Sequence, residues 1–174
     1  VPTLVSGGYT WALLTGGVGH TCGVTTTGQA YCWGSNLHGQ LGDGTTTHRT
    51  IPTLVNGGHN WASVTGGRSH TCGVTTGGEA YCWGFNRDGN LGDNTVTNRK
   101  VPTLISGGHS WASVTGGNTH SCGVTTLSKA YCWGRNSDGH LGDGTTTNRS
   151  VPTLVSRGFT NWVSVDGGEF HSCG

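Results

Sequence analysis

The stretch HTCGVTTTGQAYCWG, residues 20–34, places two cysteines ten positions apart on either side of a glycine-containing turn. The same frame returns as HTCGVTTGGEAYCWG at residues 70–84 and as HSCGVTTLSKAYCWG at residues 120–134. A three-residue turn at residues 26–28, with Gly28 in the left-handed conformation, sets Cys22 opposite Cys32. The stretch therefore predicts a β-hairpin that recurs along the chain with its two cysteines facing each other.

A period of 50 residues organises the whole chain of 174 residues. The segment VPTLVSGGYTWALLTGG at residue 1 returns at residues 51, 101 and 151, the last time with one extra residue before Trp162. The second and third copies agree at 34 of 50 positions. We therefore expect a single, partial domain over residues 1–174, made of repeat units 1–50, 51–100, 101–150 and an incomplete unit 151–174.

Each unit consists of short β-rich runs between glycine and threonine clusters, and no stretch of ten or more residues carries a helical period. Starting in the second unit, we expect strands near Trp61–Thr65, His70–Thr76, Glu79–Trp83 and Pro102–Ile105. The segment 84–100 suits a surface loop that leads to the outermost strand. Four strands per unit is the count of a β-propeller blade, so the expected fold class is all-β with blades of four antiparallel strands.

The recurring pattern resembles the repeat of the regulator of chromosome condensation family. The residues that carry the resemblance recur at fixed offsets along the whole chain, in the first unit at His20, Trp33, Gly34, Asn36, Gly39, Leu41 and Gly42. The resemblance implies a β-propeller, and about three and a half blades of a ring of about seven. The repeating cysteine pair departs from the nuclear founder of the family, so the founder's guanine-nucleotide exchange on a small GTPase is the least favoured function.

The spacing of the cysteines favours disulfides. Opposite residues of a non-hydrogen-bonded pair lie with Cα atoms ~4.5 Å apart, within reach of a disulfide. The alternatives are a metal site or a redox pair, but the spacing matches no zinc signature and no CxxC motif is present. The expected pairs are Cys22–Cys32, Cys72–Cys82 and Cys122–Cys132. Such bridges indicate an extracellular or cell-surface protein.

Cys173 stands at the position of Cys22, so its partner is expected near position 183. An intermolecular bridge is one alternative, and a longer protein cut short is the simpler one. The segment Val1–Val5 matches the outer strand of a blade whose other strands are missing, and Trp162–Gly174 matches the start of a fourth blade. We therefore expect a part of a ring or of a longer array.

The aromatic and histidine positions repeat in every unit, which favours structural roles. Trp61, Tyr81 and Trp83 and their equivalents are expected to fill the space between blades. Four histidines follow the Gly-Gly turn, with ring nitrogens expected to bond loop backbone, and a metal funnel is the less favoured alternative: His20, His70, His120 and His171. The aspartates of the loops are expected to cap those loops and not to bind calcium: Asp43, Asp93 and Asp143.

Composition argues against several functions. The formal net charge of +1, without a Lys/Arg cluster, argues against nucleic acid as a partner. No apolar run approaches the ~18 residues that a membrane helix needs, so no membrane insertion is expected. No catalytic constellation is present, so we expect no enzyme, no metal and no cofactor.

Differences between the units gather before the histidine and after the second tryptophan of each unit. The candidate binding-loop residues are Arg68, Phe85, Arg87, Asn118, Arg135 and Phe170. Variable loops on a constant scaffold favour a non-enzymatic binding module with a protein or glycan partner, although neutral drift gives the same pattern. The alternative is a structural array that self-associates through Cys173 or a blade edge. Asn148 begins the only glycosylation sequon.

Overall fold

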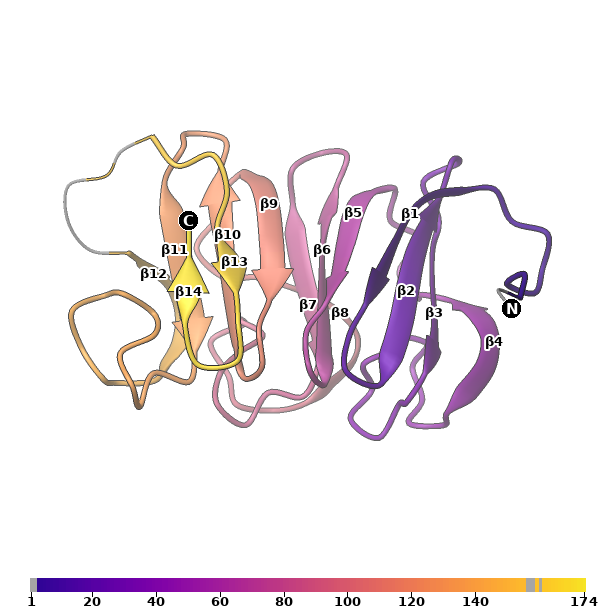
Figure 1. Ribbon diagram of the computed structural model, residues 1–174, viewed down its shortest axis with the longest axis horizontal. Helices are drawn as coiled ribbons and strands as arrows, with labels where there is room; N and C mark the ends of the chain where they lie inside the picture. The colour runs from indigo at the N-terminus through magenta and orange to yellow at the C-terminus, as the bar shows by residue number, and fades with distance from the viewer. Residues whose placement is uncertain (1–2, 156–158, 160) are drawn as a thin grey trace.

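The computed structural model describes residues 3–155, 159 and 161–174. These residues form three four-stranded antiparallel sheets and one two-stranded sheet, which stand side by side along the long axis of the molecule (Figure 1). Among them there is no helix long and apolar enough to cross a membrane. The sheets are blades of an all-β propeller, which confirms the fold class that the repeat predicts.

Each complete blade consists of four strands that are consecutive in the sequence. The first blade contains β1 (Trp11–Gly16), β2 (His20–Thr25), β3 (Ala30–Gly34) and β4 (Arg49–Leu54). The second contains β5 (Trp61–Gly66), β6 (His70–Thr75), β7 (Ala80–Gly84) and β8 (Arg99–Leu104). The third contains β9 (Trp111–Gly116), β10 (His120–Thr125), β11 (Ala130–Gly134) and β12 (Arg149–Leu154), and the partial blade contains β13 (Asp166–Gly167) and β14 (Ser172–Cys173).

The hairpin between β2 and β3 has the predicted turn and register. Gly28 has φ of 81°, and its N–H donates to the Thr25 carbonyl at 2.9 Å. Cys22 stands opposite Cys32, and the corresponding cysteines of the next two blades are paired in the same way. In the third blade Ser128 takes the place of Gly28 and keeps the left-handed conformation, with φ of 56°. The turn geometry therefore persists where the glycine is replaced.

The structure contains the three expected disulfides, Cys22–Cys32, Cys72–Cys82 and Cys122–Cys132, with Cα atoms 4.0–4.1 Å apart. All six cysteines of these disulfides are buried. Cys173 has a free thiol and is exposed. The cysteine pairs are thus cross-strand links inside each hairpin, and they join no two blades.

The outer strand differs from the expectation in two places. β8 begins at Arg99, three residues before the expected Pro102, because Arg99 pairs with Gly84 across the sheet. The expected strand over Val1–Val5 is not observed in residues 3–5, which pair with no strand in the described part of the chain. Residues 1 and 2 lie outside the described residues.

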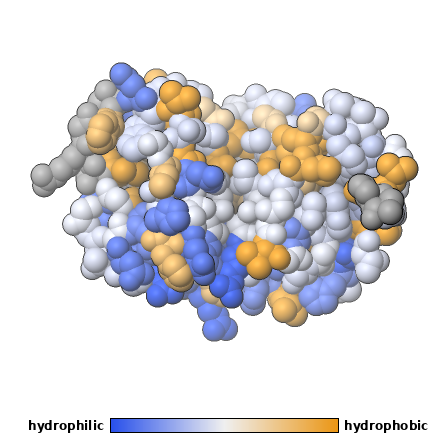
Figure 2. Space-filling view, in the orientation of Figure 1, coloured by the Kyte–Doolittle hydropathy of each residue, from blue (hydrophilic) through white to orange (hydrophobic). Residues whose placement is uncertain are grey.

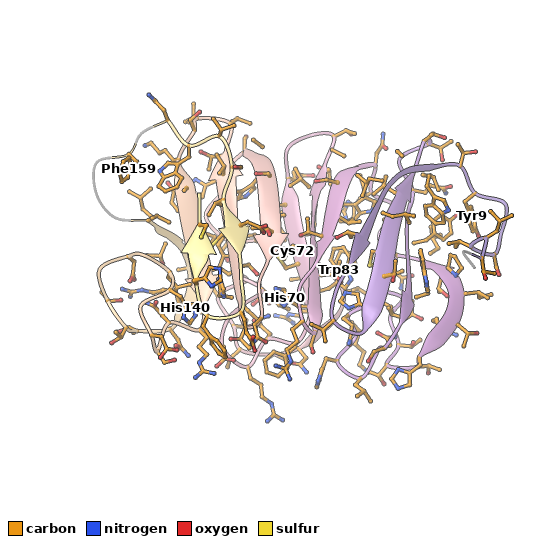
Figure 3. The ribbon with its side chains drawn as sticks, in the orientation of Figure 1. Tyr9, His70, Cys72, Trp83, His140 and Phe159 are labelled. Atoms are coloured by element: carbon orange, nitrogen blue, oxygen red, sulfur yellow. A yellow bond between two sulfur atoms is a disulfide. The ribbon has the colours of Figure 1, made fainter. Side chains whose placement is uncertain are left out.

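The core lies between blades. One buried cluster joins the disulfide face of the first blade, with Cys22, Cys32 and Leu41, to the aromatic face of the second, with Trp61 and Trp83. The next cluster repeats this arrangement one blade later. Figure 3 shows Cys72 and Trp83 inside this stack. Each blade therefore contributes one face to the junction before it and the other face to the junction after it, which confirms the expected packing of the tryptophans.

Candidate functional site

Two kinds of connection lie at the same end of the blades, along the lower edge of Figure 1. Short turns join the first strand of a blade to the second, at residues 17–19, 67–69, 117–119 and 168–171. Long loops join the third strand to the fourth, at residues 35–48, 85–98 and 135–148. We call this end the loop face. The opposite end, with the hairpin turns at residues 26–29, 76–79 and 126–129, is the hairpin face.

Backbone hydrogen bonds tie each short turn to the long loop of its own blade. The three bonds are equivalent: Ser35 N–H donates to Gly19 O at 2.8 Å, Phe85 to Ser69 at 2.9 Å and Arg135 to Thr119 at 3.0 Å. All six positions differ from one repeat to the next. The fold therefore places the two variable segments of each unit side by side on the loop face.

A buried asparagine holds each long loop in one conformation. In the second blade Asn86 is fully buried, and its side-chain amide donates to Asp93 Oδ1 and to the carbonyls of Thr95 and Thr97 at 3.0–3.2 Å. Its side-chain oxygen accepts the N–H of Leu91 at 2.9 Å. Asn36 and Asn136 make the same contacts in the other blades, so the loops share one backbone frame.

An ion pair holds each long loop in the same conformation. Asp93 Oδ2 lies 2.7 Å from Arg99 Nε, and equivalent pairs join Asp43 to Arg49 and Asp143 to Arg149. Burial by itself would raise the pKa of these carboxyls, but hydrogen bonds from threonine and the arginine outweigh it and lower the pKa, for Asp143 to about 2. Each aspartate accepts hydrogen bonds from the backbone N–H and the side-chain hydroxyl of the threonine two residues later, and so caps its loop as expected. These threonines are Thr45, Thr95 and Thr145.

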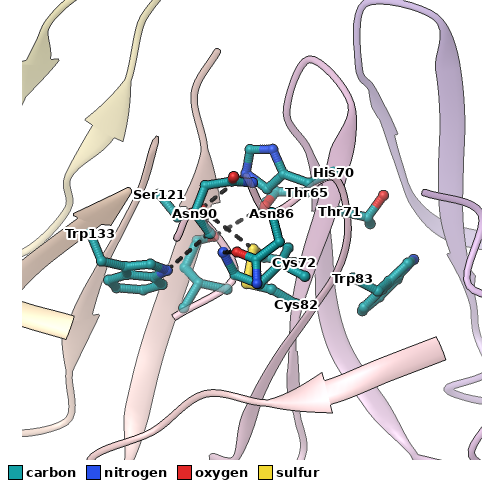
Figure 4. Close-up of a disulfide and its surroundings, with 12 residues drawn as sticks. Thr65, His70, Thr71, Cys72, Cys82, Trp83, Asn86, Asn90, Ser121 and Trp133 are labelled. Atoms are coloured by element: carbon teal, nitrogen blue, oxygen red, sulfur yellow. Dashed lines mark hydrogen bonds between the residues drawn. A yellow bond between two sulfur atoms is a disulfide. The ribbon is translucent and has the colours of Figure 1, made fainter. Parts of the chain in front are cut away.

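The histidines after the Gly-Gly turns link neighbouring blades. His70 Nε2 lies 2.9 Å from Ser121 Oγ of the third blade, and that hydroxyl donates to the carbonyl of Asn90 at 2.8 Å (Figure 4). Because the hydroxyl hydrogen is used in the second bond, the ring must donate from Nε2. The expectation of a direct bond from the ring to loop backbone is therefore wrong, since a hydroxyl of the next blade stands between them.

The same chain of bonds recurs at the other junctions, from His20 through Thr71 to Gln40 O and from His120 through Ser172 to His140 O. Burial lowers the pKa of His20 and His120 to about 4 and, together with those two rings, lowers the pKa of His70 to about 3. These rings are neutral at pH 7. Within the described residues no group of three or more His, Cys, Asp or Glu side chains is placed to hold a metal ion.

An open cavity of about 570 Å³ lies where the short turns converge. Its wall consists of the Gly-Gly pairs of four successive units, and its variable residues are Val18, Arg68, Asn118 and Glu169. Arg68 donates from Nη1 to Asn118 Oδ1 at 3.4 Å, and the backbone N–H of Arg68 donates to Gly117 O of the next blade. The cavity therefore presents one variable side chain from each unit.

The candidate binding residues do not all occupy equivalent surroundings. Arg68 and Arg87 are exposed, and Phe85 and Arg135 are half-buried on the loop face. The Phe85 ring lies 5.2 Å from that of His38, on the loop of the preceding blade. Phe170 lies in the short turn at residues 168–171, but its place is in the wall of a second cavity, beside β14. In Figure 2 strongly hydrophilic residues gather along the loop face.

Sequence reasoning missed the hydroxyl that follows each histidine. Thr21, Thr71, Ser121 and Ser172 are all hydroxyl residues, and this restriction to Thr and Ser was the available signal. Variation between units also occurs on the hairpin face, at the exposed residues Gln29, Glu79 and Lys129. Variation alone therefore does not single out one face.

Comparison with known proteins identifies the repeat. The model of the regulator of chromosome condensation (RCC1) repeat matches residues 27–74, 77–124 and 129–174. A second model of the same repeat matches residues 13–40, 61–90 and 111–139. None of the curated proteins compared with the chain matches it.

Several solved structures have the same fold. Human WBSCR16 is 21% identical with a TM-score of 0.86 over 98% of this chain and 46% of its own. Prp20p from Saccharomyces cerevisiae, described with its binding properties to Gsp1p and histones, is 22% identical with a TM-score of 0.82 over 93% of this chain and 42% of its own. The ectodomain of the receptor kinase CR4 from Physcomitrella patens is 23% identical with a TM-score of 0.64 over 100% of this chain and 39% of its own. The chain thus spans less than half the length of these structures.

Proposed function

The chain belongs to the regulator of chromosome condensation (RCC1) repeat family, and from this membership we propose that it is a non-enzymatic, extracellular binding module whose loop face engages a protein partner. The observation that carries the proposal is the pairing of short turns and long loops. It brings the variable residues of successive units onto one continuous face. Prp20p has the same fold and binds Gsp1p and histones, so a propeller of this kind can serve as a protein-binding scaffold.

The chemistry of the loop face supports a protein partner. Its candidate contacts combine guanidinium groups at Arg68, Arg87 and Arg135 with the ring of Phe85, and arginine and aromatic residues are enriched in protein interfaces. The loops that carry them are held by buried asparagines and ion pairs, so little conformational entropy is lost on binding. A glycan is the alternative partner, because arginine and aromatic side chains on a protein surface also suit sugar hydroxyls and ring faces.

The disulfides support the extracellular assignment, because disulfides persist in oxidising compartments. The CR4 structure supports it by analogy of fold alone, since that structure is an ectodomain. The absence of enzymatic activity is part of the proposal. It is supported by the loop aspartates, whose carboxylates are engaged by arginine and threonine and are not available for acid–base work.

The test compares two triple variants in affinity capture from the extracellular medium of the source cells. The loop-face variant carries Arg68→Ala, Arg87→Ala and Arg135→Ala. The matched control carries alanine at the exposed hairpin-face residues Gln29, Glu79 and Lys129. We expect a protein that the parent and the control both capture and that the loop-face variant loses, with unfolding free energies within ~1 kcal/mol of the parent for both variants.

Loss of the partner from the control and not from the loop-face variant would move the site to the hairpin face and contradict the proposal. Binding of the parent to a glycan array, abolished in the loop-face variant, would replace the protein by a sugar. A sedimentation experiment addresses the self-assembling alternative, because growth in size with concentration, without a captured partner, would favour an array over a binding module.

A further inference from the structure

The junction between the first and second blades carries an aromatic and apolar contact on the loop face. The His38 ring, in the long loop of the first blade, packs edge-on against the Phe85 ring, in the long loop of the second, with ring centroids 5.2 Å apart (Figure 1). Leu37 precedes His38 at the tip of the first loop and is 66% exposed. Both blades have all four strands, so this surface is complete within the chain.

The next junction has different chemistry at the same positions. The second loop has Arg87 and Asp88 where the first loop has Leu37 and His38. The third loop has Arg135 where the second loop has its phenylalanine. The apolar contact is therefore specific to the junction between the first and second blades.

Two free cations stand beside this contact. The first loop leans across the junction onto β8, since a side chain at Gly39 would come within 2.7 Å of Lys100 Cα, and the Gly44 N–H donates to Lys100 O at 2.9 Å. Lys100 and Arg87 are both exposed. Within residues 3–155, 159 and 161–174, neither side chain has an ion-pair partner. Their charges are therefore available to a ligand.

The carboxylates of these loops do not neutralise the two cations. Asp43 and Asp93 are each paired with an arginine of the following strand. Asp88 has the position of His38 in the second loop, so the repeat places it at the junction with the third blade. The surface around Phe85 thus has an excess of positive charge. We call the following residues the tip patch: Leu37, His38, Phe85, Arg87 and Lys100.

Buried amides hold both aromatic residues of the tip patch from beneath. Gln40 accepts the N–H of His38 at 3.0 Å through Oε1 and donates from Nε2 to Ser35 Oγ at 3.4 Å. Asn90, at the equivalent position of the second loop, donates from Nδ2 to Phe85 O at 2.6 Å. The contact surface is therefore ordered before a ligand arrives, which reduces the entropy lost on binding.

We propose that the tip patch is the centre of the binding site on the loop face and that it takes an acidic peptide segment with an apolar side chain between its carboxylates. The apolar side chain packs on Leu37 and the ring of Phe85, and the carboxylates pair with Arg87 and Lys100. The assignment rests on the proposed function, because it gives the chemistry of the partner that the loop face engages.

The third loop provides an internal comparison, because its charged side chains already bind one another. Arg135 Nε donates to Ser137 Oγ at 2.9 Å, and that hydroxyl donates to Asp138 Oδ2 at 3.0 Å. A carboxylate of a ligand would have to compete with these bonds for the guanidinium group. Arg135 is therefore a matched control for Arg87.

The test measures binding of fluorescein-labelled peptides by fluorescence anisotropy. The probe is Glu-Asp-Glu-Phe-Glu-Asp-Glu, and two matched peptides carry alanine in place of the phenylalanine or lysine in place of every acidic residue. We expect the parent protein to bind the probe at least about tenfold more tightly than either matched peptide. Equal affinities for the three peptides, or no binding of the probe below about 1 mM, would overturn the proposal.

Exposed substitutions then locate the site without affecting the fold. A double variant with Arg87→Glu and Lys100→Glu should bind the probe at least about tenfold more weakly than the parent and should bind the lysine peptide more tightly than the parent does. Leu37→Ser should weaken the probe and leave the alanine peptide unchanged. Arg135→Ala should change the affinity for the probe less than about twofold, and an effect as large as that of the double variant would overturn the proposal.

The capture experiment separates this assignment from the proposed function. A partner that the Arg68, Arg87 and Arg135 triple variant loses, but that Leu37→Ser and the double variant both retain, would keep the loop face as the binding site and overturn the tip patch as its centre. Selective binding of the probe without any captured protein would support the tip patch and count against the proposed protein partner.

Discussion

The junction between the second and third blades is closed, whereas the junction between the third blade and β13–β14 is open. At the closed junction Trp133, Leu91 and the disulfide Cys72–Cys82 are all fully buried. At the open junction the same face of the third blade borders a cavity of about 310 Å³. At the closed junction Trp133 of the following blade packs with Leu91, whereas at the open junction the corresponding Leu141 borders the cavity.

The largest expected effect comes from removing that tryptophan. Trp133→Ala should lower the free energy of unfolding by about 3–5 kcal/mol, because it empties a closed junction and removes the bond to Asn90 O. Trp33→Ala is the matched control, since Trp33 has the same place in its blade but is half-buried and should cost less than half as much. Denaturant unfolding measures both. Equal losses would mean that the tryptophan acts within its own blade and not across the junction.

The next effect tests whether the disulfide matters to the closed junction. Replacing Cys72 and Cys82 together by alanine should cost about 2–3 kcal/mol, the value that loop-closure entropy gives for a loop of this size. Cys173→Ala should leave the unfolding free energy unchanged, because that thiol is free and exposed. Non-reducing mass spectrometry checks the pairing. Detection of free thiols at Cys72 and Cys82 in the parent would contradict the structure.

A smaller effect should appear as a dependence on pH. The pKa of His70 is about 3 in the folded chain and about 6.5 when unfolded, so the unfolded state binds more protons between these values. The contribution of neutral His70 to the free energy of unfolding is therefore fully present above pH 6.5, and it is lost as the pH falls from 6.5 toward 3. Between pH 7 and pH 5 the free energy of unfolding of the parent should therefore fall by about 2 kcal/mol more than that of the His70→Gln variant.

The loop aspartates do not interfere with this measurement. Their pKa values are lowered below the ordinary carboxyl value, so their contribution is lost only as the pH falls below about 4. Unfolding midpoints recorded from pH 7 to pH 5 therefore isolate the histidines. Parallel pH profiles for the parent and the variant would show that protonation of His70 does not limit stability.

The smallest effect is expected from removing one serine hydroxyl, either at the closed junction or at the open one. Ser121→Ala should cost about 1 kcal/mol, because it breaks the buried bonds to His70 and Asn90 O at the closed junction. Ser172→Ala removes the equivalent hydroxyl at the open junction, where the residue is partly exposed and water can replace the bonds, so its cost should be smaller. A larger loss for Ser172 would indicate that the open junction is as tightly packed as the closed one.

Much of the blade could be predicted from local sequence. The hairpin follows from the turn at Gly28, and the disulfides follow from the register that this turn sets. The start of β8 was misplaced because Arg99 enters the strand through its pairing with Gly84 and through its ion pair with Asp93, which no local propensity encodes. The candidate binding residues were chosen by variation alone, which also marks the hairpin face.

The sequence by itself determined the repeat, the four-stranded blade and the cysteine pairs, because each depends on residues close together in one unit. Only the tertiary structure decided which faces meet and which loops share an end. The contacts responsible join residues 31, 43 and 51 positions apart, from Ser121 to Asn90, from Trp133 to Asn90 and from His70 to Ser121. They belong to different blades, and their formation depends on how one blade packs against the next.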